Sequence, residues 1–485
     1  MAASSKGIAT MNEPEISNSN EKINESNNEN TTEEKDSRLL PVADTPSGWP
    51  APPQRKPKTG KERKEHFIKN RSWKAAESKP RWEDKKDDRP QQTGEKEPRL
   101  PKKKVAMLIG FNGTGYQGMQ SNPDAKSIEG DLFDVLCKVG AVSKDNSTDP
   151  GKVQLVRAAR TDKGVHAAGN LVSLKLITED PDLVTKINDL LPEQIRVWGY
   201  VETSRSFHAK SSCDSRTYEY LLPSYVLMPP HKKELKDSPG AEDDKKLFIG
   251  DSEKVYYVAR STPEEIKIKD QYRVETSVFE EFRKSLDMFN GTHNFHNYTV
   301  GRSFKDKSSN RYMMNIETSE PMLIEDTEWI SVKLHGQSFM LHQIRKMISM
   351  AAMIARSKTP TSLITKSFEA DRINIPKAPA LGLLLERPVY SIYNRKADKA
   401  NEHDILTKSP EEAKHRDAID FDKYKNEIND FKEKWIYKKI FETEKNERVF
   451  DDYFILLDST PVTDYNYINS EGAIPKECII VTKHT

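Results

Sequence analysis

Cysteine is scarce in this chain, with three residues among 485, at Cys137, Cys213 and Cys478. They lie far apart in the sequence and form no C-x-x-C pair. This spacing excludes a cysteine-based zinc site, and so sparse a usage is typical of a protein in a reducing intracellular compartment.

Long hydrophobic runs are also missing. No apolar stretch approaches the roughly 20 residues that a membrane-spanning helix needs, so we expect no membrane association. The first residues are rich in Ser, Asn and Glu, and they show neither an apolar segment nor an Arg-rich amphipathic start. We therefore expect neither a secretory signal nor a mitochondrial presequence.

Charge is distributed unevenly, although the formal net charge is only +1. Residues 1–50 hold 4 basic and 9 acidic side chains, whereas residues 51–104 hold 19 basic and 9 acidic ones. A basic segment of this size predicts nucleic acid or a nuclear import receptor as a partner, and two clusters within 55–64 resemble a nuclear localisation patch. A charged tail that binds nothing in particular explains the composition equally well.

The pattern along the chain divides it into regions. They are a charged tail without hydrophobic periodicity, predicted to be disordered, at 1–100; two subdomains at 101–210 and 211–395, the second with a charged insertion at 228–275; and a helical extension at 396–485. Within the extension, an apolar stripe at helical spacing predicts a helix docked on the body. Its members are Tyr424, Ile428, Phe431 and Trp435.

The first subdomain alternates strand and helix patterns. Apolar runs predict strands at 105–111, 153–158, 171–177 and 195–201, with helices at 127–142, where Ser127 is the N-cap, and at 181–190. The order β-α-β-β-α-β is that of a ferredoxin-like unit, a sheet with helices on one face, and predicts the α+β class. The second subdomain roughly repeats this order, with strands at 218–222, 311–316 and 329–334 and helices at 278–289 and 337–356.

A basic, glycine-containing loop joins two predicted strands of the first subdomain and holds one carboxylate, Asp162. Its neighbours in sequence include Arg157, Arg160, Lys163 and His166. Nearby positive charge keeps a carboxylate ionised, so Asp162 is a candidate nucleophile for a negatively charged substrate. An ordinary turn fits this local sequence at least as well, because an Asp before Lys-Gly commonly bonds its own backbone.

The predicted helix at 337–356 is apolar almost all round, yet Arg345 lies in its middle. A guanidinium is almost never buried without a partner. Asp162 is the candidate partner if the two subdomains meet in a cleft, and pairing would lower the pKa of its carboxyl group. Snorkelling to solvent or pairing with a structural carboxylate are the alternatives.

Histidines at 293 and 296 form an H-x-x-H pair in a loop rich in Gly and Asn. The pair lacks the helix and the Glu of the zinc-protease pattern. We therefore expect His293 and His296 to bond turn backbone or contact RNA. A zinc hydrolase that uses these two together with His342 is a rival hypothesis.

Seven short motifs follow one another along the chain: 110–120 (GFNGTGYQGMQ), 160–167 (RTDKGVHA), 207–209 (FHA), 216–220 (RTYEY), 291–295 (GTHNF), 339–347 (FMLHQIRKM) and 379–383 (PALGL). In this order they resemble the TruA family of tRNA pseudouridine synthases, most closely its eukaryotic tRNA pseudouridine synthase 1 branch. The resemblance covers roughly 104–395 and the C-terminal helix. Asn112 and Met119 depart from it, because bacterial members usually carry Asp and Trp there.

The resemblance implies two ferredoxin-like units that form one continuous antiparallel sheet, with helices on one side and an RNA-binding cleft between the units. It implies isomerisation of uridine to pseudouridine in tRNA, with small nuclear and messenger RNAs as further candidate substrates. No electron or external group is transferred overall, so neither a cofactor nor a metal is chemically required. The basic tail favours the nucleus, and a monomer is expected, although the sequence leaves the oligomeric state open.

The resemblance also assigns roles to residues. Asp162 is the nucleophile or base, acting on the sugar at C1′ or at the 2′ hydrogen, and Arg345 pairs with it. Tyr218 packs against the uracil and helps to remove the C5 proton, a cross-strand aromatic being the alternative. Arg160 fills the gap left by a flipped base. RNA contacts are expected from Tyr218, Lys163, His166, His208 and His293.

Phosphate contacts of this kind predict binding that weakens steeply with salt. A non-catalytic RNA-binding module on the same scaffold is the alternative function. Such a module would bind tRNA equally well without the carboxylate of Asp162, and it would form no pseudouridine.

Overall fold

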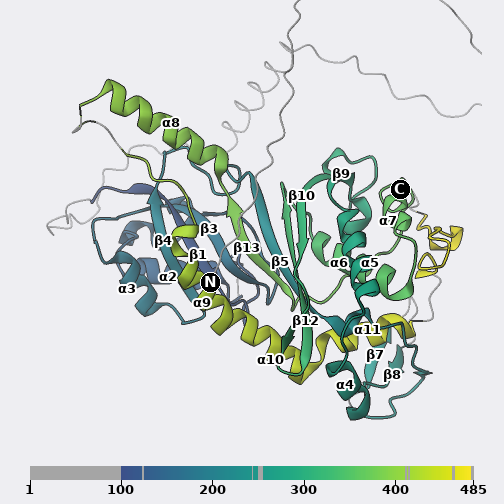
Figure 1. The fold of residues 1–485 in the computed structure, drawn as a ribbon. Coiled ribbons are helices and arrows are strands. Elements are labelled where there is room, and N and C mark those ends of the chain that lie inside the picture. The colour runs from purple at the N-terminus through teal and green to yellow at the C-terminus, as the bar shows by residue number, and fades with distance from the viewer. Residues whose placement is uncertain are drawn as a thin grey trace, which may run out of the picture. The chain divides into compact units, whose positions relative to one another are not determined.

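The computed structural model describes residues 100–122, 125–242, 244–248, 255–409, 412, 415–460 and 465–481. The predicted disordered tail, with its nuclear localisation patch at 55–64, lies outside these residues. The described part is α+β and is built around one large, mostly antiparallel sheet (Figure 1). No helix within it is both long and apolar enough to cross a membrane.

The first ferredoxin-like unit is confirmed. Its strands are β1 (Lys103–Phe111), β2 (Val156–Arg157), β3 (His166–Leu176) and β4 (Ile195–Glu202), and its helices are α2 (Ile128–Lys138) and α3 (Leu183–Leu190). The sheet runs β4-β1-β3 with β2 on β3, and every pair is antiparallel. Ser127 caps α2 as predicted, because its side chain accepts a hydrogen bond from the backbone N–H of Gly130.

The second unit repeats this arrangement. Its strands are β5 (Ser215–Pro223), β10 (Asn310–Thr318), β12 (Thr327–Gly336) and β13 (Leu383–Val389), and its main helices are α5 (Thr276–Asp287) and α6 (Gln343–Ser357). The strand order β13-β5-β12-β10 has the same sequence of positions as in the first unit. Two short strands, β9 (Gly291–Asn294) and β11 (Met322–Ile324), extend it, and α7 (Ser362–Lys366) follows α6.

The two units join edge to edge in one continuous sheet, as predicted, but the pair of strands that joins them is parallel and not antiparallel. Strands β13 and β3 pair in parallel, with Leu384 opposite His166 and Leu385 opposite Ala167. The start of β3 is open to β13 because β2 is two residues long rather than the predicted six and pairs only with Ser173 and Val172 of β3. The first residues of β3 therefore remain free on that edge, and β13 takes them.

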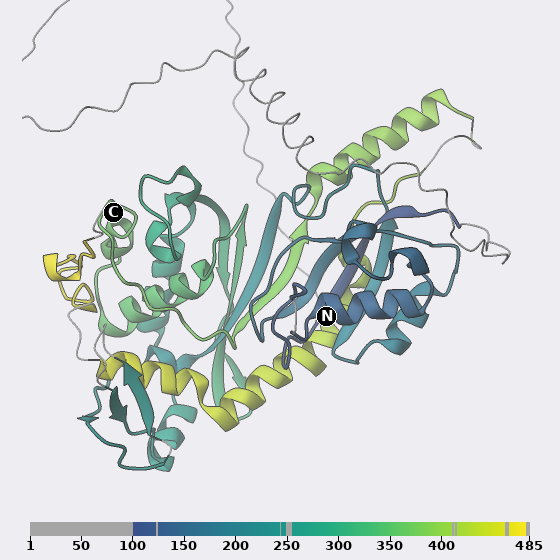
Figure 2. The ribbon, with the colours of Figure 1, turned by 180° about the vertical axis from the view of Figure 1, so that it is seen from behind.

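Helices cover both faces of the sheet, because the predicted helical extension docks on the face opposite α2. The extension contains α8 (Ser391–Thr407), α9 (Lys425–Phe431), a π-helical turn (Lys432–Tyr437), α10 (Lys438–Glu447) and α11 (Val449–Ser459). Helix α9 packs on β3, on the face opposite α2 (Figures 1 and 2). This is possible because β1 is apolar on both sides: Met107 packs in the α2 core, whereas Leu108 joins the core that contains Phe431.

The predicted apolar stripe of the extension is confirmed as a docking face. Ile428 and Phe431 are buried, and the Phe431 ring meets Trp198 edge-on with 5.4 Å between centroids. Gly199 makes room for Tyr424: a Cβ there would lie 2.1 Å from the Tyr424 hydroxyl oxygen. The extension and the sheet thus fit one another closely.

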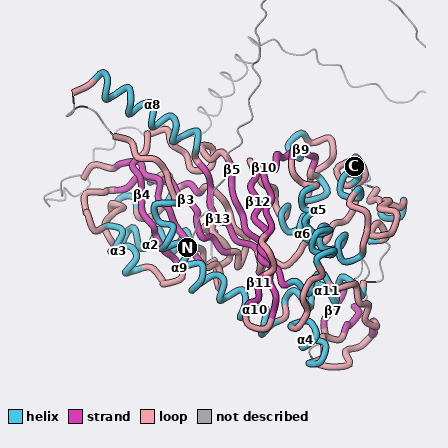
Figure 3. Tube along the Cα trace, in the orientation of Figure 1, coloured by secondary structure: helices cyan, strands magenta, loops and turns pink. Residues whose placement is uncertain are grey.

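The charged insertion is more ordered than its sequence indicates. It contains a small antiparallel sheet of β6 (Leu235–Lys236), β8 (Val255–Val258) and β7 (Lys245–Phe248), followed by α4 (Pro263–Asp270) (Figure 3). Strands of two to four residues are too short to give a visible alternation. Helix α4 begins with a capping box formed by Thr262 and Glu265.

Short 3₁₀ helices complete the described elements: η1 (Lys144–Asn146), η2 (Pro150–Val153), η3 (Ser224–Leu227), η4 (His296–Tyr298), η5 (Lys307–Ser309), η6 (Asp422–Tyr424) and η9 (Lys476–Cys478).

A buried ionic cluster fastens the extension to the sheet. The ammonium of Lys432 lies 3.0 Å from Glu219 and 2.7 Å from Glu386, and Glu219 also accepts hydrogen bonds from Ser331 and Tyr437. Burial would raise the pKa of Glu219, but Lys432 and the two hydroxyls outweigh burial and hold that pKa below its usual value. Burial likewise opposes the charge of Lys432, and the two carboxylates raise its pKa. Both groups are therefore ionised at neutral pH.

Replacing Lys432 by Met should lower the free energy of unfolding by about 3–5 kcal/mol, because Glu219 would remain buried without its counter-ion. Urea unfolding measures the change. The matched control is Lys438→Met, which removes an exposed partner of Glu442 and should cost less than about 1 kcal/mol. Equal effects of the two substitutions would contradict a stabilising role for the cluster.

Candidate active site

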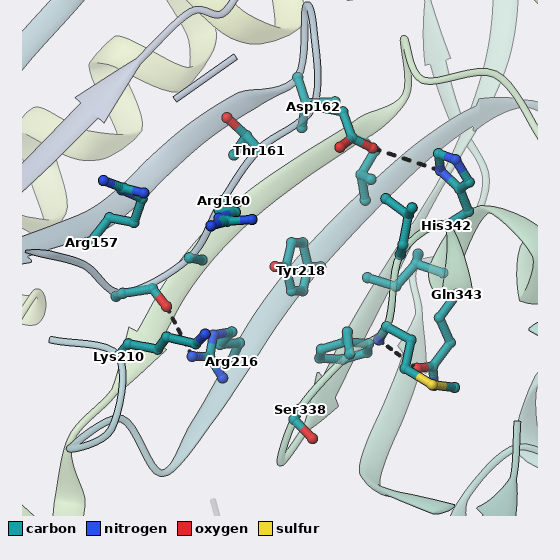
Figure 4. Close-up of a pocket in the computed structure, with 18 of the residues that line it drawn as sticks. Arg157, Arg160, Thr161, Asp162, Lys210, Arg216, Tyr218, Ser338, His342 and Gln343 are labelled. Carbon is teal, nitrogen blue, oxygen red and sulfur yellow. Dashed lines mark hydrogen bonds and ion pairs between the residues drawn. The ribbon is translucent and has the colours of Figure 1, made fainter. Parts of the chain in front are cut away.

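A cleft of about 810 Å³ lies between the two units. The loop that precedes β3 lines one side, and the segment that leads into α6 lines the other (Figure 4). Asp162, Arg160, Tyr218, His208 and Arg345 all line this cleft. Five of the residues predicted from sequence are thus brought together from four separate stretches of chain.

The loop that carries Asp162 rests on the first sequence motif. The carbonyl of Thr161 accepts a hydrogen bond from the N–H of Met119 at 3.4 Å, and the N–H of Gly164 donates to the carbonyl of Tyr116 at 3.3 Å. Gly118 permits this approach, because a Cβ there would lie 2.6 Å from the Thr161 carbonyl oxygen. The φ of Gly118, +114°, is also one that residues with a side chain rarely adopt. The glycines of the motif therefore position the carboxylate indirectly.

Asp162 projects into the cleft with 47% of its side chain exposed. Its neighbour across the cleft is His342, whose Nδ1 lies 3.7 Å from the Asp162 Oδ2. This exposure leaves the carboxylate accessible to a ligand, as a nucleophile or base must be.

Arg345 lies in the same cleft but does not form the predicted ion pair. Among the ion pairs of the described residues, Asp162 has one with His342 and none with Arg345. The Nε of Arg345 instead donates a hydrogen bond to the carbonyl of Ala378 at 2.6 Å. That bond ties the guanidinium to the chain between α7 and β13, which the sequence did not indicate.

Tyr218 lies on the floor of the cleft, on β5. Its ring meets Phe339 edge-on, with 5.0 Å between centroids. Burial raises the pKa of the Tyr218 hydroxyl to about 12, so that group is neutral at physiological pH. Tyr218 therefore offers a flat apolar surface and a neutral hydroxyl, not a phenolate.

Cations gather along the wall of the cleft near its first unit. They include Arg157, Arg160, Lys210 and Arg216, and Arg216 is held by a 2.9 Å hydrogen bond to the carbonyl of Ala158 (Figure 4). Arg157 is ion-paired with the buried Glu129. Lys210 and Arg216 were not predicted as site residues, although Lys210 follows the motif at 207–209 and Arg216 begins the motif at 216–220. The wall suits an anionic ligand.

His166 does not face the cleft, so the structure argues against its predicted phosphate contact. The side chain is 2% exposed, and its Nδ1 accepts a hydrogen bond from the N–H of Gly113 at 3.1 Å. Burial lowers the pKa of His166 to about 4, which keeps the ring neutral. The bond joins the first motif to the start of β3.

Two further predicted RNA contacts lie outside the cleft lining. Lys163 is exposed beside Asp162. His293 is on β9, where its Nε2 is 2.7 Å from the carbonyl of Asn290 and its ring stacks on Phe368 at 4.3 Å. No group of three His, Cys, Asp or Glu side chains within the described residues is arranged to hold a metal ion. His293, His296 and His342 therefore do not form the site that the zinc-hydrolase hypothesis needs.

From the sequence, His342 was named only as a ligand of the rival zinc site, and its position opposite Asp162 was missed. The predicted helix at 337–356 placed it inside a helix, whereas α6 begins only at Gln343. Residues 337–342 instead form a loop that turns back into the cleft, with His342 at its end. The apolar spacing of Phe339, Met340 and Leu341 is compatible with a helix, so periodicity gave no sign of the loop.

Together these features define an α+β protein of two ferredoxin-like units with an accessible carboxylate in a cation-lined cleft. Comparison with known proteins agrees with this architecture. The family described as tRNA pseudouridine synthase matches residues 286–391. The tRNA pseudouridine synthase 1 of Yarrowia lipolytica is 43% identical over 431 residues, which are 79% of this chain and 79% of that protein.

Two other relatives extend the comparison. The tRNA pseudouridine synthase 1 of Schizosaccharomyces pombe is 37% identical over 477 residues, covering 78% of this chain and 87% of that protein. The tRNA pseudouridine(27/28) synthase of Saccharomyces cerevisiae is 40% identical over 322 residues, which are 60% of this chain and 85% of that protein. The chain belongs to the family of tRNA pseudouridine synthases, as its motifs predicted.

Gly118→Ala should loosen the loop that carries Asp162, because the added Cβ would overlap the Thr161 carbonyl in a backbone that has no room for it. We expect a loss of about 2–4 kcal/mol in stability and faster amide hydrogen exchange at 160–165. Gly115→Ala is the matched control: its φ is +83°, but nothing lies within 4 Å of the new Cβ. If both variants exchange alike, close packing does not hold the loop.

Proposed function

We propose that this protein isomerises uridine to pseudouridine within tRNA, with Asp162 as the nucleophile or base. The names of its relatives support tRNA as the substrate. The observation that carries the assignment of Asp162 is its position: a half-exposed carboxylate in the cleft, above the ring of Tyr218 and beside a cationic wall.

The reaction needs little beyond this site. The bond between uracil N1 and ribose C1′ breaks, the base rotates while it stays bound, and C5 bonds to C1′. The proton on C5 is lost and N1 gains one, so atoms and electrons balance without an oxidant or reductant. Asp162 acts at C1′ or at the 2′ hydrogen, and both are compatible with its exposure.

The other side chains hold the base and the chain of nucleotides. Tyr218 packs against the uracil, where its neutral hydroxyl lies near the C5 proton that must leave. Arg160, which is exposed, fills the space of the extruded base, and so offsets the few kcal/mol that extrusion costs. Arg345 contributes positive charge from the opposite wall.

Tyr218→Phe should lower the rate of isomerisation more than it lowers tRNA affinity.

The cationic wall positions the RNA through its backbone. Lys210 and Arg216 would neutralise phosphates without reading sequence. Folded RNA is recognised largely through its shape and 2′-hydroxyls, so we expect phosphate and sugar contacts to dominate binding. His208 and Lys163 are exposed near the cleft and are available for further contacts.

Purified protein incubated with unmodified tRNA transcripts should form pseudouridine at defined positions. Carbodiimide treatment and reverse-transcription stops map the product. Asp162→Ala and the nearly isosteric Asp162→Asn should each leave less than about one thousandth of the activity while tRNA binding is retained. Binding by the wild type without any product would instead indicate the non-catalytic RNA-binding module.

We propose further that the enzyme acts in the nucleus, where a receptor recognises the basic patch at 55–64, and that small nuclear and messenger RNAs are also substrates. The charge of the tail supports this location. A fluorescent fusion of the full chain should accumulate in nuclei, and replacing the Lys and Arg of 55–64 by Ala should disperse it. Unchanged accumulation would exclude this patch as the signal. Transcripts of both RNA classes belong in the same isomerisation assay.

A further inference from the structure

His342 adopts an unusual backbone conformation at the edge of the cleft. Its φ is 63° and its ψ is 3°, immediately before the first residue of α6. Five non-glycine residues in the described part of the chain have positive φ, and of these only His342 lines the cleft. A residue held in this region costs about 1–3 kcal/mol, and such strain is characteristic of functional sites.

The ring of His342 carries an unsatisfied polar atom. Its Nδ1 is buried and makes no hydrogen bond within the described residues, although buried polar atoms nearly always have a partner. The nearest carboxylate is that of Asp162, at 3.7 Å. This separation exceeds the roughly 2.7–3.2 Å of an N–H···O hydrogen bond, but a small movement of either side chain would close it.

We propose that His342 is a positioning residue for Asp162: when RNA fills the cleft, its Nδ1–H donates a hydrogen bond to the Asp162 carboxylate and fixes the direction of the reactive oxygen. This inference rests on the proposed function. The left-handed backbone at His342 places the ring across the cleft from Asp162.

The surroundings of His342 favour a neutral ring. Burial lowers its pKa, the cations Lys377, Arg345 and Lys346 lower it further, and only Asp162 acts in the opposite direction. A neutral donor orients the carboxylate and leaves it less neutralised than a guanidinium would. This explains why Arg345 can be tied to Ala378 while Asp162 still has an orienting partner.

Three substitutions at His342 separate the effect of losing the proposed hydrogen bond to Asp162 from the effect of disturbing the left-handed backbone. Glycine accepts the left-handed conformation and removes the ring. Asparagine also tolerates that conformation, and its side-chain amide places an N–H where Nδ1 stands. Glutamine presents its amide near the position of Nε2 instead.

We expect the single-turnover rate with saturating tRNA to fall about 10–100-fold in His342→Gly and His342→Gln, because misplacement of a reacting group by about 1 Å has this effect. His342→Asn should stay within about threefold of wild type. The Kd for tRNA should change less than about threefold in all three. A purely structural role would not be rescued by Asn alone.

Wild-type rates in His342→Gly would overturn the proposal, as would an Asn variant as slow as the Gly variant. Failure of the proposed function looks different, because then wild type forms no pseudouridine at all. In that case crystal structures of wild type and the variants with tRNA bound decide. The Asp162 carboxylate should take one orientation in wild type and His342→Asn and several in His342→Gly, and one orientation in all three would refute the positioning role.

Discussion

The pairing of β13 with β3 is the contact on which the site depends. Leu385 of β13 stands opposite Ala167 on one side and Tyr218 on the other. Neighbouring strands are about 4.8 Å apart, so this row sets Tyr218 two strands away from the start of β3, where the loop with Asp162 ends. One β-bridge row thereby connects the halves and sets the distance between the carboxylate and the aromatic floor.

Contacts with the first motif explain how the carboxylate of Asp162 can be held in place on a loop. Loops are usually more mobile than the elements they join. Here the loop is held on its inner side by the backbone of the first motif and by the bond between Gly113 and His166. Its outer side alone faces the cleft. These contacts hold the loop and the carboxylate of Asp162 in place, and they require glycine at position 118.

Asn112 connects the first motif, which supports the loop of Asp162, to the C-terminal extension on the other face of the sheet. Its side-chain oxygen accepts a hydrogen bond from the N–H of Thr114, and its amide nitrogen donates to the carbonyl of Trp435. An aspartate could make the first bond but not the second, because an ionised carboxylate has no hydrogen to donate. The departure from the bacterial pattern at this position therefore has a physical reason in the C-terminal helices.

Much of the fold followed from the sequence, because long apolar strands such as β1 and β3 and the cap at Ser127 are set by local patterns. The ordered motifs also predicted that Asp162, Tyr218 and Arg345 share one cleft, and the structure places all three there. The partner of Arg345 was beyond reach, because a backbone carbonyl such as that of Ala378 leaves no trace in composition. The loop at 337–342 was hidden by helical spacing, and the short strands of the insertion carried too few residues to show a period.

The fit between Gly199 and Tyr424 has a consequence for any shortened form of the chain. The missing side chain leaves a hollow in the sheet that only the extension fills, and the rings of Trp198 and Phe431 rely on one another for cover. Truncation after the second unit would expose an apolar surface, with a hollow at Gly199, on the face of the sheet that the extension covers. The two ferredoxin-like units therefore do not form an independent domain, and we expect soluble protein only when the C-terminal helices are included.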